Sequence, residues 1–122
     1  MKNWINWFEI PVSDFDRAQA FYCGIFGIEM HVMDMMGMRM GIFPTEGNGG
    51  GGAIVKGDDY TPAMNGSLVY LNGGDDLDNV LNKIEGKGGR VFVPKTLIGE
   101  DMGYFAIFAD TEGNKLALHS MK

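Results

Sequence analysis

The spacing of apolar positions changes twice within the first half of the chain. Residues 4–12 are rich in aromatic and β-branched side chains, which predicts a strand. Segment 13–16 then resembles a helix capping box, with Asp16 in place of the usual Glu or Gln. The apolar residues that follow recur at helical spacing, namely Phe15, Ala18, Tyr22 and Ile25 with Phe21 at their side. Gly24 and Gly27 predict the end of that helix. Short strand candidates come next, over residues 29–33, 38–43 and 53–56.

The second half repeats this order of elements. Residues 67–72 predict a strand, and an amphipathic helix opened by Asp75 or Asp76 follows. Its apolar face is made of Leu77, Val80, Leu81 and Ile84, and its end is marked by Gly86, Gly88 and Gly89. Further strands are predicted over residues 90–93, 104–109 and 116–120, and the polar turn 110–114 separates the last two.

The doubled pattern predicts an α+β fold with two βαβββ units, residues 1–60 and 61–122, in a single domain. In each unit the helix covers one face of the sheet and leaves the other face open. Two such units side by side form a cupped mixed sheet, and concave, mostly apolar surfaces between units are where small molecules bind. We therefore expect a ligand cup lined by the open faces of the strands.

Charge and composition narrow the range of partners. The 122 residues carry a net charge of −6, and Lys and Arg are scattered, which argues against nucleic acid and anionic membranes as partners. No apolar run approaches the roughly 18 residues of a membrane span, and the first residues show no signal peptide. Cys23 is the only cysteine, so no internal disulfide can form, and we expect a cytoplasmic protein.

Two stretches of the chain resemble a known superfamily. The first reads E-I-P-V-S-D over residues 9–14 and continues with Arg17-Ala18, Phe21-Tyr22 and Phe26-Gly27, and the second reads D-T-E-G-N-K-L over residues 110–116. Together with the doubled βαβββ order, they are similar to the glyoxalase/bleomycin-resistance/dioxygenase superfamily, also called the vicinal-oxygen-chelate superfamily. The resemblance implies a fold rather than one function. It also implies a homodimer, because short members of this superfamily commonly pair, sometimes by exchanging halves.

The resemblance also implies where a metal would bind. Metal-dependent members hold a divalent ion with His and Glu from the first and last strand of each unit. These positions fall at Trp7, Ser67 and Ala117, with the fourth inside residues 53–56, which contain no His, Asp, Glu or Cys. Indole and methyl groups cannot ligate a metal, and a lone hydroxyl is a poor ligand. We therefore expect no metal and no cofactor, which argues against glyoxalase and ring-cleaving dioxygenase chemistry.

Glu9 and His119 are the most chemically capable residues left in the expected cup. By strand alternation, Glu9 shares a face with Trp7, and His119 shares a face with Ala117. A carboxylate and an imidazole suit general acid–base catalysis. The simpler interpretation places Glu9 at a solvated rim and His119 in a hydrogen bond near the chain end. We favour the simpler interpretation for catalysis, and less so for ligand binding.

The methionines between residues 30 and 40 offer an apolar surface. Met38 and Met40 alternate and so share a face, and methionine suits surfaces that accept varied apolar partners, such as a ligand cup or a dimer seam. Ordinary core filling explains them equally well. Trp7 is the expected stacking residue, whereas Tyr70 has the opposite parity to Ser67 and is expected to face the helices. The expected ligand-binding residues are therefore Trp7, Glu9, Met38, Met40, Ser67 and His119.

Two other features have structural interpretations. The glycine-rich stretch 47–52 lacks the Lys-Ser/Thr of a phosphate loop and leads into a strand. We predict a flexible connection there, with a mobile flap over the cup as the alternative. No histidine is placed by the sequence to activate Cys23, which we interpret as a structural thiol.

Three classes of function remain, in this order. The first is a metal-free protein that binds an unknown small apolar or aromatic molecule, as bleomycin-resistance proteins bind without chemistry. The second is an enzyme, either a metal-free acid–base catalyst using Glu9 and His119 or a glyoxalase-like lyase with its site elsewhere. The third is a domain that only binds another protein, which a large apolar patch outside the cup would support.

Overall fold

The computed structural model describes residues 4–46 and 51–122. The first half forms β1 (Trp7–Pro11), α1 (Phe15–Phe26), β2 (His31–Met35), β3 (Met38–Ile42) and β4 (Gly51–Lys56). The second half forms β5 (Tyr70–Asn72), α2 (Asp78–Ile84), the short 3-10 helix η1 (Glu85–Lys87), β6 (Arg90–Gly99), β7 (Gly103–Ala109) and β8 (Lys115–Ser120). The predicted α+β fold with two βαβββ units is confirmed. No helix in the described ranges is both long and apolar enough to cross a membrane.

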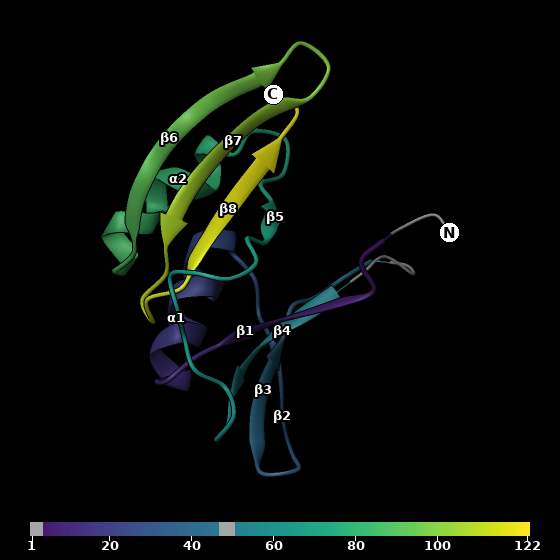
Figure 1. Cartoon of the computed structure of the whole chain (residues 1–122), viewed down its shortest axis with the longest axis vertical. Helices are drawn as coiled ribbons and strands as arrows, with labels where there is room; N and C mark the ends of the chain where they lie inside the picture. The colour runs from purple at the N-terminus through teal and green to yellow at the C-terminus, as the bar shows by residue number, and fades with distance from the viewer. Residues whose placement is uncertain (1–3, 47–50) are drawn as a thin grey trace.

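The strands form two four-stranded sheets, in the orders β1-β4-β3-β2 and β5-β8-β7-β6. In each sheet the first strand of the unit pairs in parallel with the last, and the other pairs are antiparallel. The two sheets occupy separate parts of the molecule (Figure 1). Because β1 and β5 each lie at the end of a sheet, each has an outer edge whose backbone groups have no neighbour in that sheet.

Both units contribute to one continuous core. The apolar faces predicted for the helices are confirmed, because Phe15, Ala18, Phe21, Tyr22 and Ile25 of α1 and Val80, Leu81 and Ile84 of α2 are buried. These residues pack together with the helix-facing side chains of the strands, which are Ile10, Ile54, Leu71, Ala106, Phe108, Leu116 and Leu118. The opposite face of each sheet is left without a helix, as expected.

The ends of α1 follow the local sequence closely. Asp14 is the N-cap, and its carboxylate accepts a hydrogen bond from the backbone N–H of Arg17 at 3.1 Å. Gly27 ends the helix with a left-handed φ of 65°, which costs glycine little. Gly24, expected to share that role, lies inside the helix instead.

Two strands of the second unit differ clearly from their predicted extents. β5 begins at Tyr70 rather than at Ser67, so it is shorter than expected. Strand alternation therefore cannot be counted from Ser67 to predict which way Tyr70 points. Leu71 packs into the core, and Tyr70, which was expected to face the helices, is 52% exposed. β6 is longer than expected, because Pro94 lies in a shift of register between Val93 and Thr96 and its missing N–H interrupts no regular ladder.

The turn at residues 110–114 connects the second unit to the first. The Glu112 carboxylate accepts hydrogen bonds from the backbone N–H groups of Ser13 and Asp14, at 2.9 and 2.7 Å, and from Nε of Arg17 at 2.7 Å. The Glu112 side chain is fully shielded from solvent. Because the first N–H groups of a helix have no partners within it, Glu112 acts as a capping group for a helix in the other unit.

Asp110 and Asn114 extend this contact on either side of Glu112. The buried Tyr22 hydroxyl donates to the Asp110 carboxylate at 2.7 Å. The Asn114 amide donates to the Pro11 carbonyl at 2.7 Å, and its side-chain oxygen accepts from the Ala63 N–H at 3.1 Å. We call this set the inter-unit joint, and it consists of Asp110, Glu112 and Asn114 with their partners Pro11, Ser13, Asp14, Arg17, Tyr22 and Ala63.

Glu112 and Tyr22 take opposite protonation states in the joint. Burial alone would raise the pKa of Glu112, but hydrogen bonds from Arg17 and from the backbone at the start of α1 outweigh it and lower the pKa. The pKa of Tyr22 is raised well above its ordinary value, because the phenol is buried and faces the carboxylate of Asp110. Glu112 therefore stabilises the fold as a carboxylate, and Tyr22 does so as a neutral donor.

We predict that Glu112→Ala lowers the free energy of unfolding by about 2–4 kcal/mol, because several donors at the start of α1 lose their acceptor. The lowered pKa means that this contribution is present above the ordinary Glu pKa of about 4.3 and is lost as the pH falls below it. Urea unfolding at neutral pH and near pH 3 measures both effects.

Asp34→Ala is the matched control, because it breaks the exposed ion pair with Arg39 and is expected to lower the free energy of unfolding far less than Glu112→Ala does. Equal losses from Glu112→Ala and Asp34→Ala at neutral pH would contradict a role for Glu112 in joining the units.

Candidate ligand-binding site

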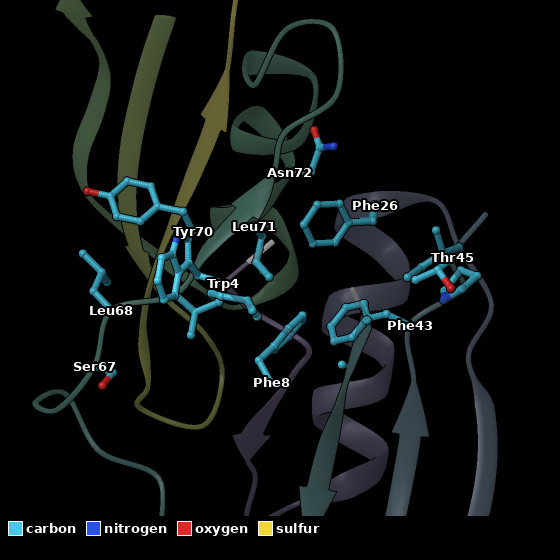
Figure 2. Close-up of a pocket in the computed structure, with 16 residues that line it drawn as sticks. Trp4, Phe8, Phe26, Phe43, Thr45, Ser67, Leu68, Tyr70, Leu71 and Asn72 are labelled. Atoms are coloured by element: carbon cyan, nitrogen blue, oxygen red, sulfur yellow. The ribbon is translucent and has the colours of Figure 1, made fainter. Parts of the chain in front are cut away.

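A cleft of about 790 Å³ lies between the first sheet and β5, and we call it the inter-unit cleft. Its aromatic lining consists of Trp4, Phe8, Phe26, Phe43 and Tyr70, and its aliphatic lining includes Ile5, Ile28, Leu68, Val69 and Leu71. Figure 2 shows labelled side chains from both units around this space. The described residues that line it include no Asp, Glu, Lys, Arg, His or Cys.

The first unit supplies a cluster of phenylalanines to the cleft. The ring centroids of Phe8 on β1 and Phe43 after β3 lie 5.7 Å apart, and Phe26 at the end of α1 meets Phe43 edge to face at 6.5 Å. Gly52 on β4 makes room for this cluster, since a Cβ there would approach the Phe8 ring to 2.5 Å. The rings therefore form a rigid apolar wall on the helix side of the first sheet.

The second unit supplies the opposite wall and the polar groups. Leu71 of β5 is buried beside the cleft, and Tyr70 and Asn72, which flank it, are exposed. The Asn72 side-chain oxygen accepts from the Gly74 N–H at 2.9 Å, which orients its amide group. Ser67 and Tyr70 add hydroxyl groups to the lining. The arrangement combines a large apolar surface with a few neutral hydrogen-bonding groups, which suits an uncharged ligand.

The expected site residues fall into three places. Ser67 lines the inter-unit cleft, although it precedes β5 rather than opening it. Trp7 and Glu9 lie on the face of the first sheet opposite Phe8, because successive strand residues alternate. His119 lies on β8 in the other sheet. The structure therefore brings Trp7 and Glu9 together but leaves His119 on a separate sheet.

Met38 and Met40 share a face with Trp7 and Glu9. Met40 pairs with Val55 and Met33, and Met38 pairs with Met35, so these side chains lie on one face of the first sheet. We call this surface the methionine face, which consists of Met33, Met35, Met38, Met40, Ile42, Ala53 and Val55. Met40, Ala53 and Val55 are buried, whereas Met33 and Met35 are exposed. The face is thus partly packed and partly open.

Glu9 and His119 have separate hydrogen-bond partners. Glu9 accepts from Trp7 Nε1 at 3.2 Å and from the Tyr60 hydroxyl at 2.5 Å. His119 Nε2 lies 2.6 Å from the carbonyl oxygen of Met102. Each residue is positioned within its own unit, so one chain alone does not assemble them into an acid–base pair.

The positions that metal ligands occupy in metal-dependent relatives are apolar or isolated here. Ala117 is fully buried and pairs with Tyr70, and Ala53 is buried on β4. Across residues 4–46 and 51–122, no group of three or more His, Cys, Asp or Glu side chains is placed to hold a metal ion. Burial raises the pKa of the Cys23 thiol, which disfavours the nucleophilic thiolate and fits the interpretation as a structural residue.

Sequence reasoning missed the aromatic wall of the cleft. Phe8, Phe26 and Phe43 have the spacing and chemistry of ordinary core residues, and all three pack against the core. Trp4 was assigned to the first strand, yet it precedes β1 and is 89% exposed beside the cleft. Its exposure depends on where the strand begins, which the apolar pattern did not indicate.

Comparison with known proteins agrees with this architecture. Residues 4–118 match the sequence model of the Glyoxalase/Bleomycin resistance protein/Dioxygenase superfamily. A glyoxylase-like domain-containing protein of Didymella fabae is 30% identical over 124 residues, which cover 93% of this chain and 91% of that protein.

Solved structures give the same fold. A variant of glyoxalase I from Zea mays has a TM-score of 0.73 and 16% identity, and the match covers 97% of this chain but 45% of the maize chain. TnmS3, an antibiotic binding protein from a Streptomyces species, has a TM-score of 0.65 and 23% identity, and the match covers 98% of both chains. At these identities the likeness concerns the fold alone, and this chain spans about half the length of the maize enzyme. The family match over nearly the whole chain shows that it belongs to the Glyoxalase/Bleomycin resistance protein/Dioxygenase superfamily.

Proposed function

We propose that this protein binds a small apolar or aromatic molecule in the inter-unit cleft without a metal and without chemistry. The observation that carries this proposal is a cleft of about 790 Å³ lined by aromatic and aliphatic side chains, in which the described residues supply no acid, base, imidazole or thiol. That size lies within the roughly 300–1,000 Å³ typical of ligand sites. A ligand held there meets surfaces for stacking and burial, and the described lining offers it hydroxyl and amide groups but no carboxylate, imidazole, ammonium or thiol.

Binding of a small molecule has a parallel among proteins of this fold. TnmS3, which shares the fold over nearly its whole length, is described as an antibiotic binding protein. The acid–base form of the competing enzyme hypothesis requires Glu9 and His119 to meet, and within one chain these residues lie on different sheets. The separation of the two groups favours the binding function.

We also propose that the protein forms a homodimer through the outer edges of β1 and β5. Both edges lack a neighbour within their own sheet. Large apolar side chains lie close to them, with Trp4 89%, Ile5 62% and Tyr70 52% exposed. These three residues also line the inter-unit cleft, so a second copy would cover its mouth. Burial of such residues is a common driving force for symmetric pairing.

The cleft proposal predicts saturable binding of a neutral planar probe, N-phenyl-1-naphthylamine, measured by its fluorescence. Leu68→Trp places an indole in the cleft and is expected to weaken binding at least about fivefold, since steric exclusion removes buried apolar contact. Leu97→Trp is the matched control, because it adds the same ring to an exposed position on β6 and leaves the cleft unchanged.

EDTA is expected to have no effect on this binding, because no lining side chain is a metal ligand. Equal affinity of the wild type and Leu68→Trp for the probe, or loss of binding on chelation, would count against the proposed function.

The dimer proposal predicts a mass of twice 13.4 kDa by light scattering at micromolar concentration. Ile5→Asp puts a charge beside the β1 edge and is expected to raise the dimer dissociation constant at least about tenfold. Ile98→Asp makes the same change on β6 and is expected to leave it unchanged. A monomer mass for the wild type would refute the dimer.

A further inference from the structure

Among the carboxylates held in place in the described residues, Glu9 accepts from two neutral side chains, whereas Asp14 and Glu85 each accept from one backbone N–H. The ion pairs within the described residues use Glu112, Asp34, Asp76 and Asp78. Buried Asp110 has no basic partner, but its oxygens accept hydrogen bonds from Tyr22, from the Asn114 amide and from backbone N–H groups. Glu9 is exposed, and two neutral side chains hold it. Within residues 4–46 and 51–122 it is thus an oriented carboxylate with neither a cation nor a full set of donors.

The geometry leaves part of the Glu9 carboxylate available. Trp7 Nε1 donates to one oxygen at 3.2 Å, and the Tyr60 hydroxyl donates to the other at 2.5 Å. A carboxylate has about four lone-pair positions, so roughly half of them remain open to a ligand donor. The hydrogen bond to Glu9 raises the pKa of Tyr60, which keeps the phenol protonated as the donor. Both rings present their polar edges to Glu9 and stand beside it.

Two surfaces of different character adjoin Glu9. On one side lies the methionine face, since Glu9 pairs with Ala53 on β4. On the other side is a hollow of about 150 Å³ that Glu9 shares with the polar residues Thr61, Asn65 and Ser67. That volume is several times the roughly 30 Å³ that one water occupies in the liquid, so it has room for a small polar group.

We propose that Glu9, Trp7 and Tyr60 form a binding site for an alkylammonium group, carried by a ligand whose apolar body lies on the methionine face. The N–H groups of such a ligand would make charge-assisted hydrogen bonds to the open positions of Glu9. The net charge of −6 attracts a cation. Glu9 and Phe8 are successive residues that point to opposite faces of β1, so the carboxylate faces away from the phenylalanine wall of the inter-unit cleft, although Ser67 lines both the cleft and the hollow.

The test uses the full chain and three probes of similar size, namely 2-phenylethylammonium, neutral 2-phenylethanol and anionic 3-phenylpropionate. Nuclear magnetic resonance titration following the indole N–H of Trp7 reports directly on the hydrogen bond to Glu9. We expect the ammonium probe to shift this resonance saturably at low salt and to bind at least about tenfold more tightly than the other two. Added salt should weaken the ammonium probe selectively.

Two charge changes should act in opposite directions. Glu9→Gln keeps the shape of the side chain and is expected to weaken ammonium binding about tenfold. Lys115 lines the same hollow, so Lys115→Gln removes a like charge and is expected to strengthen binding about twofold to threefold. Glu100→Gln at the tip of the β6–β7 hairpin is the control for net charge, and thermal unfolding verifies that each variant is folded.

Equal binding of the ammonium probe by the wild type and Glu9→Gln would overturn the proposal. So would the absence of any saturable shift, or equal affinity for the ammonium and the alcohol. Leu68→Trp, which fills the inter-unit cleft, should leave ammonium binding unchanged. Failure at Glu9 is therefore distinguishable from failure of the proposed function.

Discussion

The relative placement of the two βαβββ units depends on a carboxylate that is hidden from solvent. Glu112 belongs to the turn before β8, yet its hydrogen-bond donors lie at the start of α1, about a hundred positions earlier in the chain. A buried carboxylate is costly unless its oxygens are satisfied. Arg17 and two backbone N–H groups meet that requirement in one orientation of the units. The requirement for these donors therefore fixes how the second unit sits on the first.

The inter-unit cleft follows from that placement. Its walls come from different units, with Phe8 and Phe43 on one side and Leu71 and Tyr70 on the other. Neither wall forms a cavity without the other. The joint and the cleft also differ in the groups they contain. Charged and strongly hydrogen-bonded groups lie at the joint, whereas apolar and neutral groups line the cleft. In this account the motifs that identify the superfamily stabilise the arrangement of the units, and the ligand meets other residues.

The sequence predicted the elements and the helix faces well, because both depend on local spacing. Phe15 and Ile25, for example, are buried where the helical pattern placed them. It also located the turn 110–114, since Asp, Gly and Asn in that order favour a turn. It could not show that Glu112 reaches α1, because no local pattern encodes a contact between distant segments.

The residues of the candidate site were harder to predict from the sequence, because their positions also depend on contacts between distant segments. Parity along β1 correctly set Glu9 on the same face as Trp7, but parity does not indicate which face adjoins a cavity. Phe8 and Phe43 look like core residues in the sequence, and their place at the cleft depends on how the two sheets are set apart. Tyr70 was assigned to the wrong face because the strand begins three residues later than the pattern suggested.

The most direct measurement of the central claim is the set of nuclear Overhauser effects between bound N-phenyl-1-naphthylamine and assigned side-chain protons of the protein. The account predicts contacts from the probe to Phe8, Phe43 and Leu71, which line the inter-unit cleft from both units. Contacts confined to Trp7, Met38 and Met40 would place the ligand on the methionine face and contradict the account.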